Sequence, residues 1–178
     1  MINALWAIGM SVGILFIAKT PGYADPMSYL FGNILLVSRG DLILLAVLDA
    51  IVVLLAWRGY FQLEASAFDE EFARTRGVPT DAVFLIILGI TAVAVVVLQT
   101  FVGIVMVIAM LTLPAGTAGY FAKNLGRMML IGSGLSLAFS LIGLVVSWRL
   151  DLPSGAVVVL VAGAVFLAVS ALRMRRKA

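Results

Sequence analysis

The side chains that could do chemistry in this sequence are a few carboxylates, and three of them stand together. Asp69, Glu70 and Glu71 lie within Glu64–Gly77, a polar, charged segment of a chain that is otherwise almost continuously apolar. A further carboxylate, Asp49, lies near the middle of an apolar run. The sequence contains no histidine and no cysteine, so imidazole and thiolate groups are absent as metal ligands, bases or nucleophiles. Because the acidic triplet has no companion of that kind, we do not expect an enzyme.

The composition indicates that these carboxylates belong to a membrane protein. Hydrophobic residues make up 63% of the chain and charged residues 12%, whereas a soluble domain has about 25% charged residues. The apolar residues form unbroken runs rather than the alternating pattern of a membrane β-barrel strand. Helices satisfy their own backbone groups inside lipid. We therefore expect an all-α polytopic membrane protein in which residues 1–178 form a single transmembrane domain.

The apolar runs predict about five transmembrane helices and one short external helix. The longest run, Ala82–Ala122, would extend ~60 Å as one helix, twice the thickness of the hydrocarbon core. It must fold back, and Gln99, Thr100 and the nearby Gly103 mark the expected reversal. Ser28–Ser38 would reach only ~16 Å, which is typical of a re-entrant or interfacial helix. Six apolar segments are candidates for these spans: Ile2–Ala18, Leu42–Trp57, Ala82–Leu98, Val102–Tyr120, Met128–Trp148 and a last one that ends at Leu172.

The basic residues predict the orientation of the chain. If the basic tail that begins at Arg173 is cytoplasmic, alternation of the spans puts nine of the twelve Lys and Arg residues inside and leaves Lys19, Arg39 and Arg149 outside. Residues 58–81 then form a cytoplasmic loop, and the short helix at Ser28–Ser38 is external. We expect an inner (plasma) membrane protein, surrounded by lipid, with both termini in the cytoplasm.

Within the cytoplasmic loop, Phe68–Gly77 is predicted to form a helix. Its first turn carries the acidic triplet and its end carries arginines, which suits the helix dipole. Phe68 and Phe72 lie four residues apart and would share one face. Pro79 then stops the helix, and Thr80 or Asp81 can cap the next span. Such a helix either lies on the lipid surface or docks a soluble partner, and the periodicity leaves both interpretations open.

Two residues inside the predicted spans could serve transport. A carboxylate at Asp49 costs ~2.5 to 3.5 kcal/mol on insertion scales, so it should face protein or water. It either lines a cation pathway or is protonated and hydrogen-bonded to a neighbouring helix. Pro114 should kink its helix and is a possible hinge, although close packing is the simpler role for the small residues around it. Close helix packing is also expected at Gly132, Gly134 and Gly143.

Four segments of the chain carry a resemblance to a known family. Glu71–Ala73, followed after three residues by Gly77, resembles the Glu-Ala-Ala-x-x-x-Gly coupling motif of ATP-binding-cassette importer permeases. Met27–Asp41, Leu111–Ala118 and Asp151–Gly155 lie in the order and spacing found in the second half of ABC-3 type permeases, which import zinc, manganese or iron. The resemblance covers essentially the whole chain and implies the fold of a type II importer.

The resemblance also implies partners and a mechanism. ATP with magnesium would be bound and hydrolysed on a separate cytoplasmic subunit, since this sequence has no phosphate-binding Gly-Lys-Ser/Thr loop and is expected to bind no cofactor itself. An external solute-binding protein would dock over the short external helix, and two permease copies would form a homodimer; no nucleic acid is expected. The implied ATPase-coupling residues are Phe68, Asp69, Glu70, Glu71, Phe72, Ala73 and Gly77, with Phe72 in place of the motif's middle alanine.

The sequence leaves two other functions open. A permease for an organic metal chelate or vitamin, of the siderophore or cobalamin type, shares the same layout, and it would not require Asp49 as a cation pathway does. A non-transport membrane assembly protein is the remaining class.

Family members carry several further spans before the position that matches Ile2, so we expect a truncated gene product, an expressed fragment or a mis-assigned start.

Overall fold

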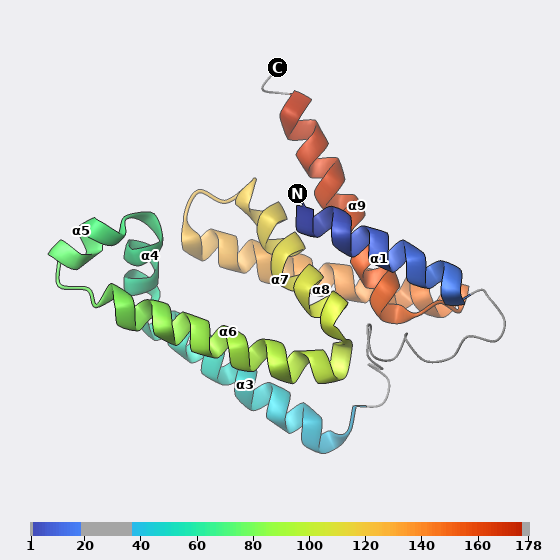
Figure 1. Cartoon of the computed structure of the whole chain (residues 1–178), viewed down its shortest axis with the longest axis horizontal. Helices are drawn as coiled ribbons and strands as arrows, with labels where there is room; N and C mark the ends of the chain where they lie inside the picture. Colours follow the sequence, from blue (N-terminus) through green and yellow to red (C-terminus); the bar gives the residue numbers. More distant parts are fainter. Residues whose placement is uncertain (1, 19–36, 176–178) are drawn as a thin grey trace. The chain divides into compact units, whose positions relative to one another are not determined.

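The computed structural model describes residues 2–18 and 37–175, and all regular elements in these ranges are α-helices. The chain divides into two compact units. Unit 1 comprises Met1–Leu35 and Leu98–Ala178, and unit 2 comprises Leu36–Val97. Figure 1 labels the helices of both units.

In its described residues, unit 1 contains four helices that pack around one apolar core. They are α1 (Ile2–Ala18), α7 (Ile104–Gly119), α8 (Leu125–Leu150) and α9 (Ser154–Arg175). The helices α7, α8 and α9 pack pairwise against one another, and α1 packs on α7 and α9 (Figure 1). Leu113, Val105, Val158 and Val159 are among the largest fully buried side chains. Aliphatic side chains therefore fill much of the space between these helices.

Glycines allow the closest approaches within unit 1. A β-carbon on Gly143 of α8 would lie 2.4 Å from Val158 Cγ2 and 2.6 Å from the Val158 Cα of α9. A β-carbon on Gly116 would lie 3.0 Å from the Phe166 ring. These distances confirm the predicted packing role of Gly143. At Gly134 a β-carbon would meet no atom within 4 Å, so the packing role predicted for that residue is wrong within the described chain.

Unit 2 contains α3 (Arg39–Arg58), α4 (Tyr60–Phe68), α5 (Glu70–Thr75) and most of α6 (Thr80–Val102). A capping box starts α3: Asp41 N donates to Ser38 Oγ at 3.2 Å, and Ser38 N donates to Asp41 Oδ2 at 2.9 Å. The helix therefore begins at Arg39, three residues before the predicted start of the span. No residue of α3 is buried, so its apolar surface stays available to lipid or another protein.

The membrane-length helices agree approximately with the predicted spans. The helices α3, α6, α8 and α9 contain stretches long and apolar enough to cross a membrane, whereas α1 and α7 are shorter apolar helices. The expected count of about five is therefore approximate. The predicted external helix, Ser28–Ser38, lies almost entirely outside the described residues, and its last residue, Ser38, is the N-cap of α3.

The break in the longest apolar run lies later than predicted. The helix α6 continues through Gln99 and Thr100 and ends at Val102, so these two polar residues do not form a hairpin. Gly103 follows with a φ of 78°, a left-handed conformation that glycine adopts readily. Polar side chains can stay helical near a helix end, but a positive φ interrupts the helix. Gly103, which the sequence had marked as nearby, is therefore the residue that breaks the run.

Candidate functional site

The loop at residues 58–81 is mostly helical, and its helices differ from the one predicted. Phe68 is the last residue of α4, and Asp69 is extended, with φ −153° and ψ 99°. Asp69 Oδ1 accepts a hydrogen bond from Phe72 N at 2.9 Å, so Asp69 is the N-cap of α5 rather than a first-turn residue. Phe68 and Phe72 therefore lie on different helices, and the prediction of one helix over Phe68–Gly77 with a shared aromatic face is wrong.

The C-terminal end of α5 explains the glycine of the segment that resembles a coupling motif. Gly77 has a φ of 80°. Gly77 N donates to Arg74 O at 3.0 Å, and Val78 N donates to Ala73 O at 3.0 Å. These two bonds form a Schellman motif, in which a left-handed residue, usually glycine, follows the helix. A β-carbon at Gly77 would meet no atom within 4 Å, so steric contact does not require glycine there. The left-handed backbone conformation of the turn does.

One arginine joins α5 to the start of α6. Arg74 Nε donates to Thr80 Oγ1 at 2.8 Å, and Arg74 Nη2 lies 3.0 Å from Glu70 Oε1 and 2.6 Å from Asp81 Oδ1. Thr80 is 4% exposed, whereas the side chains of Arg74 and Asp81 are 52% and 82% exposed. We call these four residues the Arg74 cluster. A single guanidinium therefore bridges the two helices across the turn at Gly77.

The surface of α5 combines a buried small residue with exposed acidic and aromatic groups. Ala73 is 1% exposed, so the position that matches the last alanine of the coupling motif faces the protein. Glu70 and Glu71 are exposed, and Phe72 is 55% exposed, with the Arg76 guanidinium 5.1 Å from its ring centroid. The helix thus presents an exposed phenyl ring, a residue type that is enriched in protein interfaces, with carboxylates beside it.

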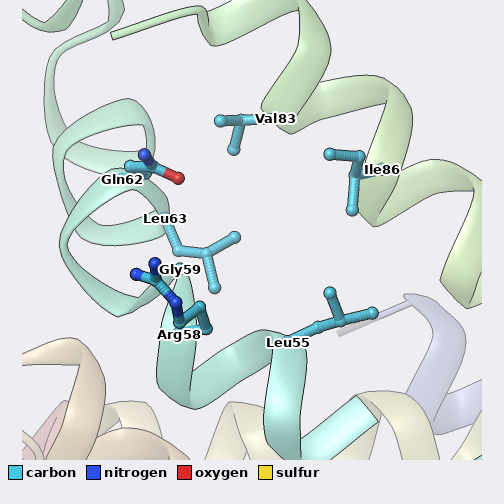
Figure 2. A pocket seen from close by; sticks show the side chains of 7 residues that line it. All are labelled: Leu55, Arg58, Gly59, Gln62, Leu63, Val83 and Ile86. Atoms are coloured by element: carbon cyan, nitrogen blue, oxygen red, sulfur yellow. The ribbon is translucent and has the colours of Figure 1, made fainter. Parts of the chain in front are cut away.

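A cleft within unit 2 lies between the α3–α4 corner and α6. Its volume is about 350 Å³. Figure 2 shows Leu55, Leu63, Val83 and Ile86 around this space. Arg58, with Gly59 and Gln62, completes the lining. With no carboxylate and a single cation, this lining resembles a packing or lipid-contact surface more than a reaction site.

The two predicted transport residues lie in different units. Asp49 is exposed on α3 of unit 2. Pro114 is buried inside α7 of unit 1. Within residues 2–18 and 37–175, no three Asp or Glu side chains come close enough together to hold a metal ion. The roles of Asp49 in the pathway and of Pro114 as a hinge remain predictions.

The Arg74 cluster is the part of this site that sequence reasoning missed. The pair formed by Glu70 and Arg74, four residues apart on a helix, could have been recognised from spacing alone. The bonds from Arg74 to Thr80 and Asp81 depend on how the chain turns at Gly77, which spacing does not show. The sequence did offer one signal for this turn: Gly77, because glycine commonly follows the last residue of a helix.

Comparison with known proteins places the chain in one family. The family described as ABC 3 transport family matches residues 1–173. An uncharacterized membrane protein of Synechocystis is 41% identical over 94% of this chain and 60% of its own length. The manganese transport system membrane protein MntC of Listeria monocytogenes is 33% identical over 93% of this chain and 59% of its own length.

A solved structure has a similar fold. PsaBC from Streptococcus pneumoniae, in complex with Fab, is similar with a TM-score of 0.76 and 29% identity over 90% of this chain and 58% of that chain. This chain spans about 60% of the length of these relatives. The all-helical fold, the membrane-length helices and the match over residues 1–173 together show that the chain belongs to the ABC 3 transport family, whose members are membrane proteins.

Proposed function

We propose that this chain forms part of the permease subunit of an ATP-binding-cassette importer for a divalent transition-metal ion. The name of the relative MntC, a manganese transport system membrane protein, makes manganese the first candidate, with zinc and iron next. The metal is cargo and not a resident cofactor. Because the sequence has no histidine or cysteine, any imidazole or thiolate ligand of the metal would come from other parts of the assembly.

The observation that carries the proposal is the geometry of α5. A six-residue helix, Glu70–Thr75, is capped by Asp69 and closed at Gly77. It exposes Phe72 and its acidic neighbours between two longer helices. We propose that the docking face of α5, defined here as Glu71 and Phe72, binds a cytoplasmic ATP-hydrolysing subunit. ATP hydrolysis on that subunit would move α5, and the spans would open alternately to the two sides.

The remaining partners follow from the same proposal. An external solute-binding protein would deliver the ion above residues 28–38, and a second permease copy would complete the pathway. Residues 58–81 and both termini would lie in the cytoplasm, as the distribution of basic residues predicts. Asp49 would attract the cation toward the pathway.

The test is transport by the full-length permease that carries this chain. The permease would be reconstituted in vesicles with its ATPase subunit and its binding protein, and uptake of radioactive manganese, zinc and ferrous iron would be compared with and without ATP. We expect ATP-dependent uptake of at least one of these ions. Uptake of none of them, with uptake of a ferric chelate or cobalamin instead, would replace the metal-ion proposal by the organic-cargo one.

A further inference from the structure

The short helix α5 is attached unequally to its two neighbours. Toward α4, the chain between the helices is one extended residue, Asp69, which caps α5 by accepting from the Phe72 amide; α4 and α5 also pack against each other, but no side-chain hydrogen bond between them is among those described. Toward α6, the Schellman bonds close the C-terminal end of α5, and the Arg74 cluster adds bonds from α5 to Thr80 and Asp81. The junction with α6 therefore holds the direction of α5 through side chains as well as backbone.

The geometry of Arg74 suits a mechanical link. A guanidinium is planar and presents several donors in a fixed fork, so it can hold several acceptors in one arrangement. Arg74 uses two nitrogens on three acceptors, at 2.6 to 3.0 Å. An isolated exposed ion pair contributes little. Here, however, one acceptor belongs to Thr80, which is 4% exposed and fixed in the first turn of α6.

We propose that Arg74 is a positioning residue that makes α5 and the first turn of α6 move as one body. This inference rests on the proposed function, in which a partner displaces α5. With the Arg74 cluster intact, that displacement reaches the α6 span directly. Without it, rotation in the linker at Arg76–Pro79, which contains Gly77, absorbs part of the displacement. Arg74 then determines how much of the motion at the docking face reaches the membrane.

The first test measures the link without requiring the partner. This sequence has no cysteine, so once any cysteine in the rest of the full-length permease is replaced, spin labels can be placed at Glu71→Cys on α5 and Val96→Cys on α6. Pulsed electron–electron double resonance then gives the distribution of distances between the two labels. We expect a narrow distribution for the parent protein, a broader one for Arg74→Gln and an intermediate one for Arg74→Lys.

Arg76→Gln is the matched control for this measurement. It removes the same charge two residues away but breaks no bond of the Arg74 cluster, because the Arg76 guanidinium lies over the Phe72 ring. We expect its distance distribution to equal that of the parent. An unchanged distribution in Arg74→Gln, or equal broadening in Arg74→Gln and Arg76→Gln, would overturn the proposal.

The second test asks whether the link carries motion. In vesicles containing the permease, the ATPase subunit and the binding protein, the ATP hydrolysed per manganese ion imported would be measured for the parent, Arg74→Gln and Arg58→Gln. We expect Arg74→Gln to keep the ATPase bound but to raise this ratio at least about fivefold, the lower end of ordinary coupling between sites. Arg58→Gln should leave the ratio unchanged.

A covalent replacement separates positioning from a general loss of structure. In Arg74→Cys/Asp81→Cys, a bifunctional thiol reagent of suitable length should lower the ratio again toward that of the parent. An unchanged ratio in Arg74→Gln, or no recovery after cross-linking, would overturn the transmission of motion. If the parent permease binds no ATPase subunit, the proposed function fails, and the proposed transmission of motion from α5 to α6 fails with it. The distance measurement still decides whether Arg74 fixes α5 on α6.

Discussion

Replacing Gly77 distinguishes a conformational requirement from a contact requirement at the candidate docking site. Gly77 has a φ of 80°, and a β-carbon at this position would meet no atom within 4 Å. A substitution therefore changes the energy of the turn without a clash inside the chain. Asparagine tolerates the left-handed conformation better than alanine, and a β-branched residue tolerates it worst.

The expected loss of affinity follows from the free-energy cost of the left-handed backbone conformation at residue 77. A residue with a β-carbon in the left-handed conformation costs ~1 to 2 kcal/mol, which corresponds to a change of about 5- to 30-fold in an equilibrium. If the turn is lost, so are the bonds from Gly77 N to Arg74 O and from Val78 N to Ala73 O, both 3.0 Å. We expect the affinity of the ATPase subunit to fall about 5- to 30-fold for Gly77→Ala. The fall should be smaller for Gly77→Asn and larger for Gly77→Val.

The assay is equilibrium binding of the purified ATPase subunit to the full-length permease in lipid nanodiscs. The order of the variants decides between the two explanations. If Gly77 is needed because the partner approaches closely, the larger asparagine should bind worse than alanine. A weaker affinity for Gly77→Asn than for Gly77→Ala would therefore refute the conformational explanation.

Three further predictions concern packing, capping and transport. Gly143→Ala should destabilise the protein by about 1 to 3 kcal/mol through overpacking against Val158, whereas Gly134→Ala should not; thermal unfolding in one detergent compares the two, and equal melting temperatures would contradict the packing. Asp69→Ala should weaken α5 by ~1 kcal/mol and speed hydrogen exchange at the Phe72 amide, while Asp69→Asn keeps the cap; equal exchange in both variants would show that the cap does not matter. Asp49→Asn should reduce manganese uptake without releasing the ATPase subunit, and full uptake would remove Asp49 from the pathway.

The sequence predicted the membrane helices well because long apolar runs leave few alternatives in lipid. It placed most helix ends within a few residues, but it misplaced the break in the longest run. Gln99 and Thr100 looked like a turn because they are polar, yet they remain in α6, which ends just before Gly103. Polarity alone therefore located that break less well than the conformational freedom of glycine.

At the candidate docking site, the sequence identified the segment but not its internal structure. The charge content of Glu64–Gly77 and the coupling motif both pointed to it. The periodicity suggested one helix because Phe68 and Phe72 have helical spacing, but Asp69 caps a new helix between them. Capping by a side chain competes with helix continuation, and the outcome depends on the geometry of the turn. The bonds of Arg74 to Thr80 and Asp81 arise from that same turn.

The most direct test of the central claim is co-purification of the ATPase subunit with the full-length permease, compared between the parent and a Phe72→Asp, Gly77→Arg double variant. The first change replaces the exposed ring of the docking face by a carboxylate, and the second disrupts the turn that ends α5. Gly134→Ala, where a β-carbon would meet no atom within 4 Å, is the folded control. We predict that the ATPase subunit binds the parent and the control and is lost from the double variant. Retention by a correctly folded double variant would contradict the assignment of α5 as the docking helix.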